Sequence, residues 1–149
     1  QAHGEVTKRR GTTGGLEGAS HWPGEPHTAR GWGGGAAINS KAGRVGGYLE
    51  AVKGHDRCAA SGVPVWCGGM LETGLGRAAN IALAALPGFT MTGDISASDR
   101  YFFRDITEPF VMHDGVLDVP TGPGLGVTID IDALTKYTTA VEEIRPYGS

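Results

Sequence analysis

The stretch Val63-Pro-Val-Trp-Cys-Gly-Gly-Met-Leu-Glu-Thr-Gly-Leu-Gly-Arg77 decides the fold of this 149-residue chain. A run of β-branched and aromatic residues leads into two glycines, then an acidic residue, and then a possible helix start at Thr73. This order is typical of a strand that ends at an active-site rim, because glycines let the backbone pass close to a ligand.

A second unit of the same kind lies just upstream. Ala37-Ile-Asn-Ser-Lys-Ala-Gly-Arg-Val-Gly-Gly47 also runs from a short strand to glycines, and Lys41 stands where that strand ends. Strands that alternate with helices at this spacing pair in parallel. Two such units, with reactive groups at the strand carboxyl ends, predict part of a (β/α) barrel. A complete eight-fold barrel needs about 250 residues, so this chain can hold only a portion of one.

The apolar pattern predicts the other elements. We expect strands at 37–40, 63–67 and 89–91, and helices at 48–60, 73–86 and 132–143. The first helix should turn these residues inward: Leu49, Val52, Cys58 and Ala59. The second should bury Leu75, Ala78, Ala79, Ala82, Leu83 and Leu86. Asp114-Gly115 lies at the centre of an alternating run and predicts a hairpin, with His113 exposed beside the turn.

The chain divides near residue 36. Residues 1–36 hold ten of the 26 glycines and very few aliphatic residues. Such a segment buries too little apolar surface to offset the entropy of ordering it, so we expect it to be irregular or disordered. Its histidines (His3, His21 and His27) have a spacing that fits no metal motif. Residues 37–149 then form one domain.

Composition narrows the function classes. The net charge is −3 and the pI is near 5.9, which gives no electrostatic reason to expect nucleic acid or an anionic membrane as a partner. The sequence shows neither an 18-residue apolar stretch nor the apolar core of a signal peptide. We therefore expect a cytoplasmic protein in which Cys58 and Cys67 are buried free thiols.

Residues 37–127 closely resemble the C-terminal part of the o-succinylbenzoate synthase and N-acylamino-acid racemase group, in the muconate-lactonising branch of the enolase superfamily. Five motifs carry the resemblance: Lys41-Ala-Gly-Arg-Val-Gly-Gly47, Val63 to Arg77, Gly93-Asp-Ile-Ser-Ala-Ser-Asp-Arg100, Asp105-Ile-Thr-Glu-Pro-Phe110 and Pro120-Thr-Gly-Pro-Gly-Leu-Gly126. The resemblance implies an α/β fold: about the last three strands of a (β/α)7β barrel, followed by a hairpin and a helix.

The resemblance also implies the chemistry. Members of this group abstract the proton α to a carboxylate, and a bound Mg²⁺ or Mn²⁺ stabilises the resulting enolate. Lys41 matches the catalytic acid/base lysine at the end of the sixth strand, although alone it would pass for a surface lysine. Gly69, Met70 and Leu71 match the wall of the substrate pocket, although Met70 also suits plain core packing. Glu72 is expected to bind substrate together with these residues, although it could also contact the lysine network or only fix the strand–helix turn.

The chain departs from the group in three respects. Ser40 and Gly54 stand where the group has larger apolar residues. The metal carboxylates should precede Lys41, yet residues 1–36 do not resemble the group there. Glu17 lies at about the right distance along the sequence, but its neighbours do not match, so we predict no metal ligand in this chain.

Two hypotheses from different classes follow. In the first, the chain is a fragment of a metal-dependent o-succinylbenzoate synthase (a lyase) or N-acylamino-acid racemase (an isomerase). On this hypothesis the parent enzyme acts on a small-molecule carboxylate and forms a homo-oligomer, whereas the fragment is inactive alone. In the second, it is a non-catalytic partial barrel. Dipeptide epimerase and muconate cycloisomerase remain alternatives within the enzymatic class.

Overall fold

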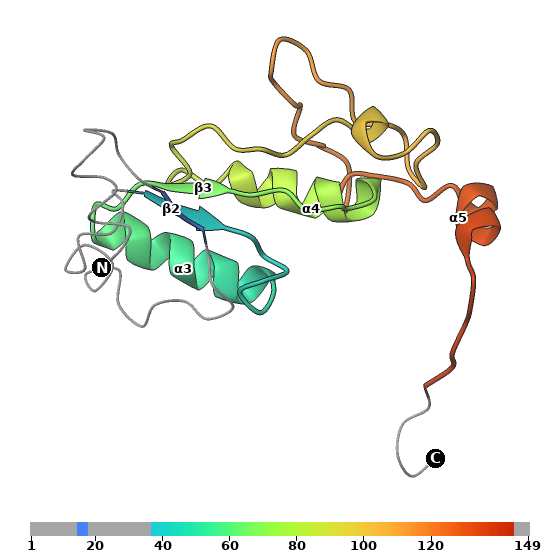
Figure 1. Ribbon diagram of the computed structural model, residues 1–149, viewed down its shortest axis with the longest axis horizontal. Coiled ribbons are helices and arrows are strands. Elements are labelled where there is room, and N and C mark those ends of the chain that lie inside the picture. The colour runs from blue at the N-terminus through green and yellow to red at the C-terminus, as the bar shows by residue number, and fades with distance from the viewer. Residues whose placement is uncertain (1–14, 18–36, 145–149) are drawn as a thin grey trace.

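The computed structural model of the protein describes residues 15–17 and 37–144 (Figure 1). Among these residues, the elements are, in order, β1 (Gly15–Glu17), β2 (Ala37–Ser40), α3 (Tyr48–Ala60), β3 (Val65–Cys67), α4 (Gly74–Ala84), the 3₁₀ turn η1 (Ser98–Arg100) and α5 (Ile131–Tyr137). The sheet and its two helices lie together, whereas the residues after α5 lead away from them (Figure 1).

The three strands form a parallel sheet in the order β1-β2-β3. Ile38 pairs with Val65 and Ser40 with Cys67, and beyond the last pair the Gly68 amide donates to the Ser40 carbonyl at 2.8 Å. The predicted parallel pairing of 37–40 with 63–67 is confirmed. Strand β1 lies inside the segment that we expected to be irregular, and it pairs with β2 from Gly15↔Ala37 to Glu17↔Asn39. Our expectation for 1–14 and 18–36 falls outside the described residues.

Helices α3 and α4 pack on the same face of the sheet. One buried cluster joins β2, β3 and α3 through Ile38, Cys58, Val63 and Val65. A second joins both helices to β3 through Ala42, Ala51, Cys67 and Leu83. Because side chains alternate along a strand, Asn39 and Trp66 face the opposite side of the sheet. One face of the sheet is thus covered by helices and the other carries a different set of side chains. The same layering occurs in one sector of a (β/α) barrel.

The buried face of α3 differs from our prediction. Cys58 is buried, but Leu49 is 81% exposed and Val52 and Ala59 also face solvent. The residues that pack inward are Ala51, Gly54, His55 and Cys58. They follow the regular spacing of an amphipathic helix, yet three are small and one is a histidine, so a search for large apolar side chains selects the wrong stripe. Gly62, with φ at 61°, ends the helix as predicted.

The histidine in this stripe connects α3 to the turn after α4. His55 Nε2 accepts a hydrogen bond from the Gly88 amide at 2.8 Å, and the ring stacks on Phe89 with centroids 5.0 Å apart. Since Nε2 accepts, the ring proton lies on Nδ1, which is 2.9 Å from Asp56 Oδ1. A Cβ on Gly88 would come within 2.9 Å of the imidazole Cδ2, so the glycine permits this close contact.

Helix α4 also buries a different set from the one expected. Ala78 and Leu83 are buried as predicted, whereas Leu75 is 39% exposed and Ala82 also faces solvent. Arg77 and Asn80 are almost completely buried instead. Side chains from outside α4 bond the Asn80 amide and Arg77 Nη1, and apolar periodicity does not detect these contacts. Arg77 Nε and Nη2 are buried without a hydrogen-bond partner among the described residues.

The C-terminal elements are shorter than predicted. The strand expected at 89–91 is reduced to one parallel bridge between Val65 and Phe89. The hairpin is a turn at Asp114 and Gly115, both with positive φ, closed by one bridge between His113 and Val116. Helix α5 ends at Tyr137 rather than at residue 143. The side chains around the turn and after α5 are mostly exposed, so packing does not extend either element.

Within the described residues, we find no helix that combines the length and the apolar character needed to cross a membrane.

Candidate functional site

Lys41 directly follows β2 and lies over a glycine of the neighbouring strand end. By alternation it shares a face of the sheet with Asn39, away from the helices. A Cβ on Gly68 would overlap Asn39 Oδ1 and come within 2.7 Å of Lys41 Cγ and Cε. Gly68 is therefore the residue that lets the lysine side chain cross the end of β3. This places Lys41 at the carboxyl edge of the sheet, where sequence analysis expected it.

The wall segment, residues 69–71, is held by two carboxylates. The Gly69 amide donates to Asp94 Oδ1 at 2.6 Å, and the Met70 amide donates to Glu72 Oε1 at 2.7 Å. Met70 is 47% exposed and Leu71 is 74% exposed, so neither side chain is part of the core. Core packing of Met70, one of our two readings, is therefore wrong. Residues 69–71 therefore expose two apolar side chains on a backbone that is fixed from both sides.

Glu72 acts on the turn between β3 and α4. Besides the Met70 amide, its Oε1 accepts a hydrogen bond from Asn80 Nδ2 at 2.6 Å. Asn80 Oδ1 accepts in turn from the Tyr48 hydroxyl at 3.0 Å. These bonds match the turn-fixing role that we considered for Glu72. Tyr48 and Asn80 were not singled out from the sequence, because each reads there as an ordinary helix residue.

Burial and nearby carboxylates alter two ionisable groups beside the wall. Burial raises the pKa of the Cys67 thiol to about 12, and the negative charges of Glu72 and Asp94 add to this effect. Burial also raises the pKa of Tyr48, followed by the charges of Glu72 and Cys67. Both groups are therefore neutral at physiological pH, and Cys67 is packed as an apolar side chain rather than poised as a nucleophile. The two cysteines are free and buried, as predicted.

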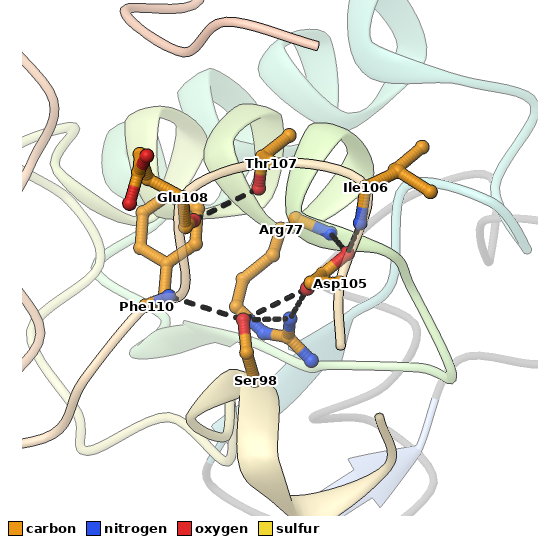
Figure 2. Close-up of polar contacts among 8 residues, drawn as sticks. Arg77, Ser98, Asp105, Ile106, Thr107, Glu108 and Phe110 are labelled. Atoms are coloured by element: carbon orange, nitrogen blue, oxygen red, sulfur yellow. Dashed lines mark hydrogen bonds and ion pairs between the residues drawn. The ribbon is translucent and has the colours of Figure 1, made fainter. Parts of the chain in front are cut away.

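A buried network anchors the segment after residue 94 to α4 (Figure 2). Arg77 Nη1 lies 3.3 Å from Asp105 Oδ2 and donates to Ser98 Oγ at 3.2 Å, while Ser98 Oγ donates to the same carboxylate oxygen at 2.8 Å. Ser98 Oγ also accepts from the Phe110 amide at 3.0 Å. Arg77 and Asp105 come from two of the motifs quoted above, but nothing in their spacing shows that they pair.

Asp105 also caps α4. Thr73 stands at the N-cap position, as predicted, but its side chain makes no capping hydrogen bond. The Gly74 amide instead donates to Asp105 Oδ1 at 2.8 Å, across 31 positions of sequence. A carboxylate at a helix N-terminus satisfies an otherwise unpaired amide and complements the helix dipole. The network thus fixes the helix that follows the wall.

The described residues do not assemble a metal site. No group of three or more His, Cys, Asp or Glu side chains within 37–144 is placed to hold a metal ion. The backbone of β1 does end beside the site, because Glu17 pairs in register with Asn39, two residues before Lys41. Among the described residues, Lys41 and the segment 69–71 lie at the same end of the sheet.

The parallel sheet with helices on one face makes the described part of the chain an α/β fold. The chain belongs to the family described as Enolase C-terminal domain-like, which matches residues 33–133.

Similar proteins agree with this assignment. An N-succinylamino acid racemase from Amycolatopsis is 67% identical over 103 residues, and an o-succinylbenzoate synthase from Listeria innocua is 55% identical over 109. A crystal structure of an enolase superfamily member from Listeria innocua superposes with a TM-score of 0.81 at 44% identity, covering 93% of this chain and 38% of that one. The alignments take in 69% and 72% of this chain but only 28% and 29% of the two curated relatives.

Proposed function

We propose that this chain supplies the Lys41 part of an active site that abstracts the proton α to a carboxylate. The reaction is either the dehydration that forms o-succinylbenzoate or the racemisation of an N-acylamino acid. Lys41 is the acid/base on one face of the substrate. In the racemisation it takes the α-proton or supplies one while a lysine on the opposite face does the reverse, and in the dehydration the abstracted proton is balanced by a proton that leaves with the hydroxyl group as water. Gly69, Met70 and Leu71 form the wall against the succinyl or acyl part, and Glu72 shapes that wall.

One observation carries this proposal: Lys41 lies over Gly68 at the carboxyl edge of the sheet, beside the exposed wall. A general base must reach the proton that it removes, and this edge is where barrel enzymes place their reacting groups. The identity to the racemase and the synthase favours these two reactions over those of a dipeptide epimerase or a muconate cycloisomerase.

The proposal includes a requirement for the rest of a barrel. Abstraction of a weakly acidic α-proton needs the enolate charge to be stabilised, which a divalent cation such as Mg²⁺ or Mn²⁺ does in this superfamily. The described residues hold no ligand set for such an ion. On this proposal, Lys41 exchanges the proton, and the stabilisation of the enolate must come from elsewhere in the barrel. We therefore expect the chain to be inactive alone.

A chimera tests the role of Lys41. The aligned 103-residue portion of the Amycolatopsis racemase would be replaced by that of this chain, and α-proton exchange of an N-succinylamino acid would be followed in D₂O by NMR. We expect the chimera to catalyse exchange and racemisation, and Lys41→Ala to abolish the racemisation together with the exchange of one enantiomer. Lys53→Ala is the matched control, because Lys53 lies exposed on α3 and pairs with Glu50. Racemisation that survives Lys41→Ala refutes the catalytic role.

The isolated chain tests the requirement for the rest of the barrel. Calorimetric titration with Mg²⁺ or Mn²⁺ should show no saturable binding, and the exchange assay should show no turnover. Saturable binding together with Lys41-dependent exchange would contradict our expectation of inactivity.

The second candidate, a non-catalytic partial barrel, is favoured by the three-stranded open sheet that the described residues form. It predicts a chimera that folds but catalyses no exchange. For the parent of the catalytic fragment, we propose a homo-oligomer that binds a small-molecule carboxylate.

A further inference from the structure

A line of hydrogen bonds runs from the first residue of α3 to the backbone of the wall. The Tyr48 hydroxyl donates to Asn80 Oδ1 at 3.0 Å, Asn80 Nδ2 donates to Glu72 Oε1 at 2.6 Å, and the Met70 amide donates to the same oxygen at 2.7 Å. The bonds connect three segments that are separate in sequence: the start of α3, the middle of α4 and the turn after β3.

The buried amide of Asn80 gives this line a fixed direction. Asn80 is only 3% exposed, and both ends of its side chain are bonded. A carboxylate can only accept, so the amide nitrogen must face Glu72 and the amide oxygen must face Tyr48. The hydroxyl of Tyr48 therefore donates. A reversed amide would leave its oxygen against a carboxylate, so the Asn80 amide has a single orientation. The Tyr48 hydroxyl also lies 3.4 Å from the Gly76 carbonyl, a longer contact than the one to Asn80 Oδ1.

The line couples the two strand–helix units. Tyr48 lies seven positions after Lys41, at the end of the loop that begins with the lysine, whereas Met70 belongs to the wall. The backbone just before Met70 also has little freedom to move, because a Cβ on Gly69 would come within 3.2 Å of backbone atoms of Asp94 and Ile95. The Met70 backbone is thus held between Asp94 and the line that begins at Tyr48.

We propose that Tyr48, Asn80 and Glu72 form a positioning relay that sets the Met70 backbone relative to the loop of Lys41. The relay acts on a ligand only through the wall. Its importance for catalysis rests on the function proposed above, but its existence does not. Glu72 is then a positioning residue rather than a substrate contact.

Amide hydrogen exchange in the full chain tests the relay, with the Met70 amide observed by NMR. Tyr48→Phe removes one hydroxyl, and Asn80→Leu removes the bridge at similar volume. We expect the Met70 amide to exchange about tenfold faster in Asn80→Leu, which corresponds to the loss of one net hydrogen bond, and by a smaller factor in Tyr48→Phe. Glu72→Gln keeps an acceptor oxygen and should largely preserve protection, whereas Glu72→Ala should abolish it.

A titration separates a relay from general loosening of the fold. Burial first, and the charge of Glu72 second, raise the pKa of Tyr48. Glu72→Gln should therefore lower the pKa of Tyr48, observed in ¹³Cζ-labelled tyrosine, without exposing the ring. Leu49→Ala, at the adjacent and 81% exposed position, is the matched control and should change neither the titration nor the exchange.

The outcomes are distinct. The relay is refuted if Asn80→Leu leaves the exchange rate of the Met70 amide unchanged while the variant melts as the parent chain does. That outcome does not bear on the proposed role of Lys41. If protection and the Tyr48 titration respond as stated, the relay holds even where the chimera shows no α-proton exchange. An unchanged pKa of Tyr48 in Glu72→Gln also contradicts it.

Discussion

Gly68 shows how a residue without a side chain can position a reactive one. Asn39 in β2 and Lys41 just after it lie on the same face of the sheet, and their side chains fill the space that a Cβ on residue 68 would take. Asn39 is 3% exposed, and its Oδ1 has no hydrogen-bond partner among the residues that the structure describes. A buried acceptor of this kind is destabilising, and such strain is commonly kept at functional sites.

Replacing Gly68 by alanine should displace Lys41. The added methyl overlaps Asn39 Oδ1 and the lysine stem, so we expect a destabilisation of about 1–3 kcal/mol in chemical denaturation. In the chimera, the rate of α-proton exchange should fall with it. Gly43→Ala is the control, because a Cβ there meets nothing within 4 Å. If both variants behave alike, Gly68 has no special role beside Lys41.

Cys67 should be unreactive while the chain is folded. Its thiol has a pKa of about 12, and both cysteines are buried, so a disulfide reagent at pH 8 should label neither until denaturant is added. Rapid labelling of the native chain would contradict this expectation.

The raised pKa of Cys67 also makes the stability of the chain depend on pH in the alkaline range. The native pKa is raised above the ordinary value of 9.0, so the unfolded chain releases the thiol proton first. The contribution of the neutral Cys67 thiol to the free energy of unfolding is complete below pH 9 and is lost as pH rises toward about 12. The difference in unfolding free energy between the chain and Cys67→Ala should decline over this range.

At the scale of elements, the sequence predicts the strand–helix order well and the packing faces less well. Tyr48–Ala60 and Ala37–Ser40 have the predicted bounds, because glycines mark their ends. The buried faces of α3 and α4 were missed because they include a histidine, an arginine and an asparagine, whose partners lie on other segments. The position of Lys41 and of residues 69–71 at strand ends could be predicted from the sequence. Their roles come from the resemblance to the family and stay a prediction.

The network around Arg77 should be the main polar anchor of α4. Asp105→Ala leaves a buried guanidinium without its counter-charge and the Gly74 amide without its cap, so we expect a destabilisation of about 3–5 kcal/mol by chemical denaturation. Ser98→Ala, a milder change, should reduce stability by about 1 kcal/mol.

The exposed pair between Arg104 and Asp130 supplies a control for this network. Both side chains contact solvent, so Arg104→Ala should leave the unfolding free energy without a measurable change. A loss as large as that of Asp105→Ala would show that charge alone, rather than burial, governs the network.

At the scale of the whole molecule, the described sheet has two edge strands, β1 and β3, and is not closed. Large apolar side chains face solvent, among them Phe103, Leu49, Val141 and Ile144. Unpaired strand edges and exposed apolar surface both favour association. We expect light scattering after size-exclusion chromatography to show self-association that grows with protein concentration. A compact monomer that melts cooperatively would show that the chain needs no further part of a barrel.

The cap on α4 also bears on how the chain emerges from the ribosome. Translation delivers Gly74 well before Asp105, so the helix that follows the wall must wait for its cap until the later segment has left the exit tunnel. Until then the first turn of α4 has an unpaired amide and Arg77 has no counter-charge. A release of the nascent chain between these two positions would leave the helix uncapped, however complete the sheet beneath it.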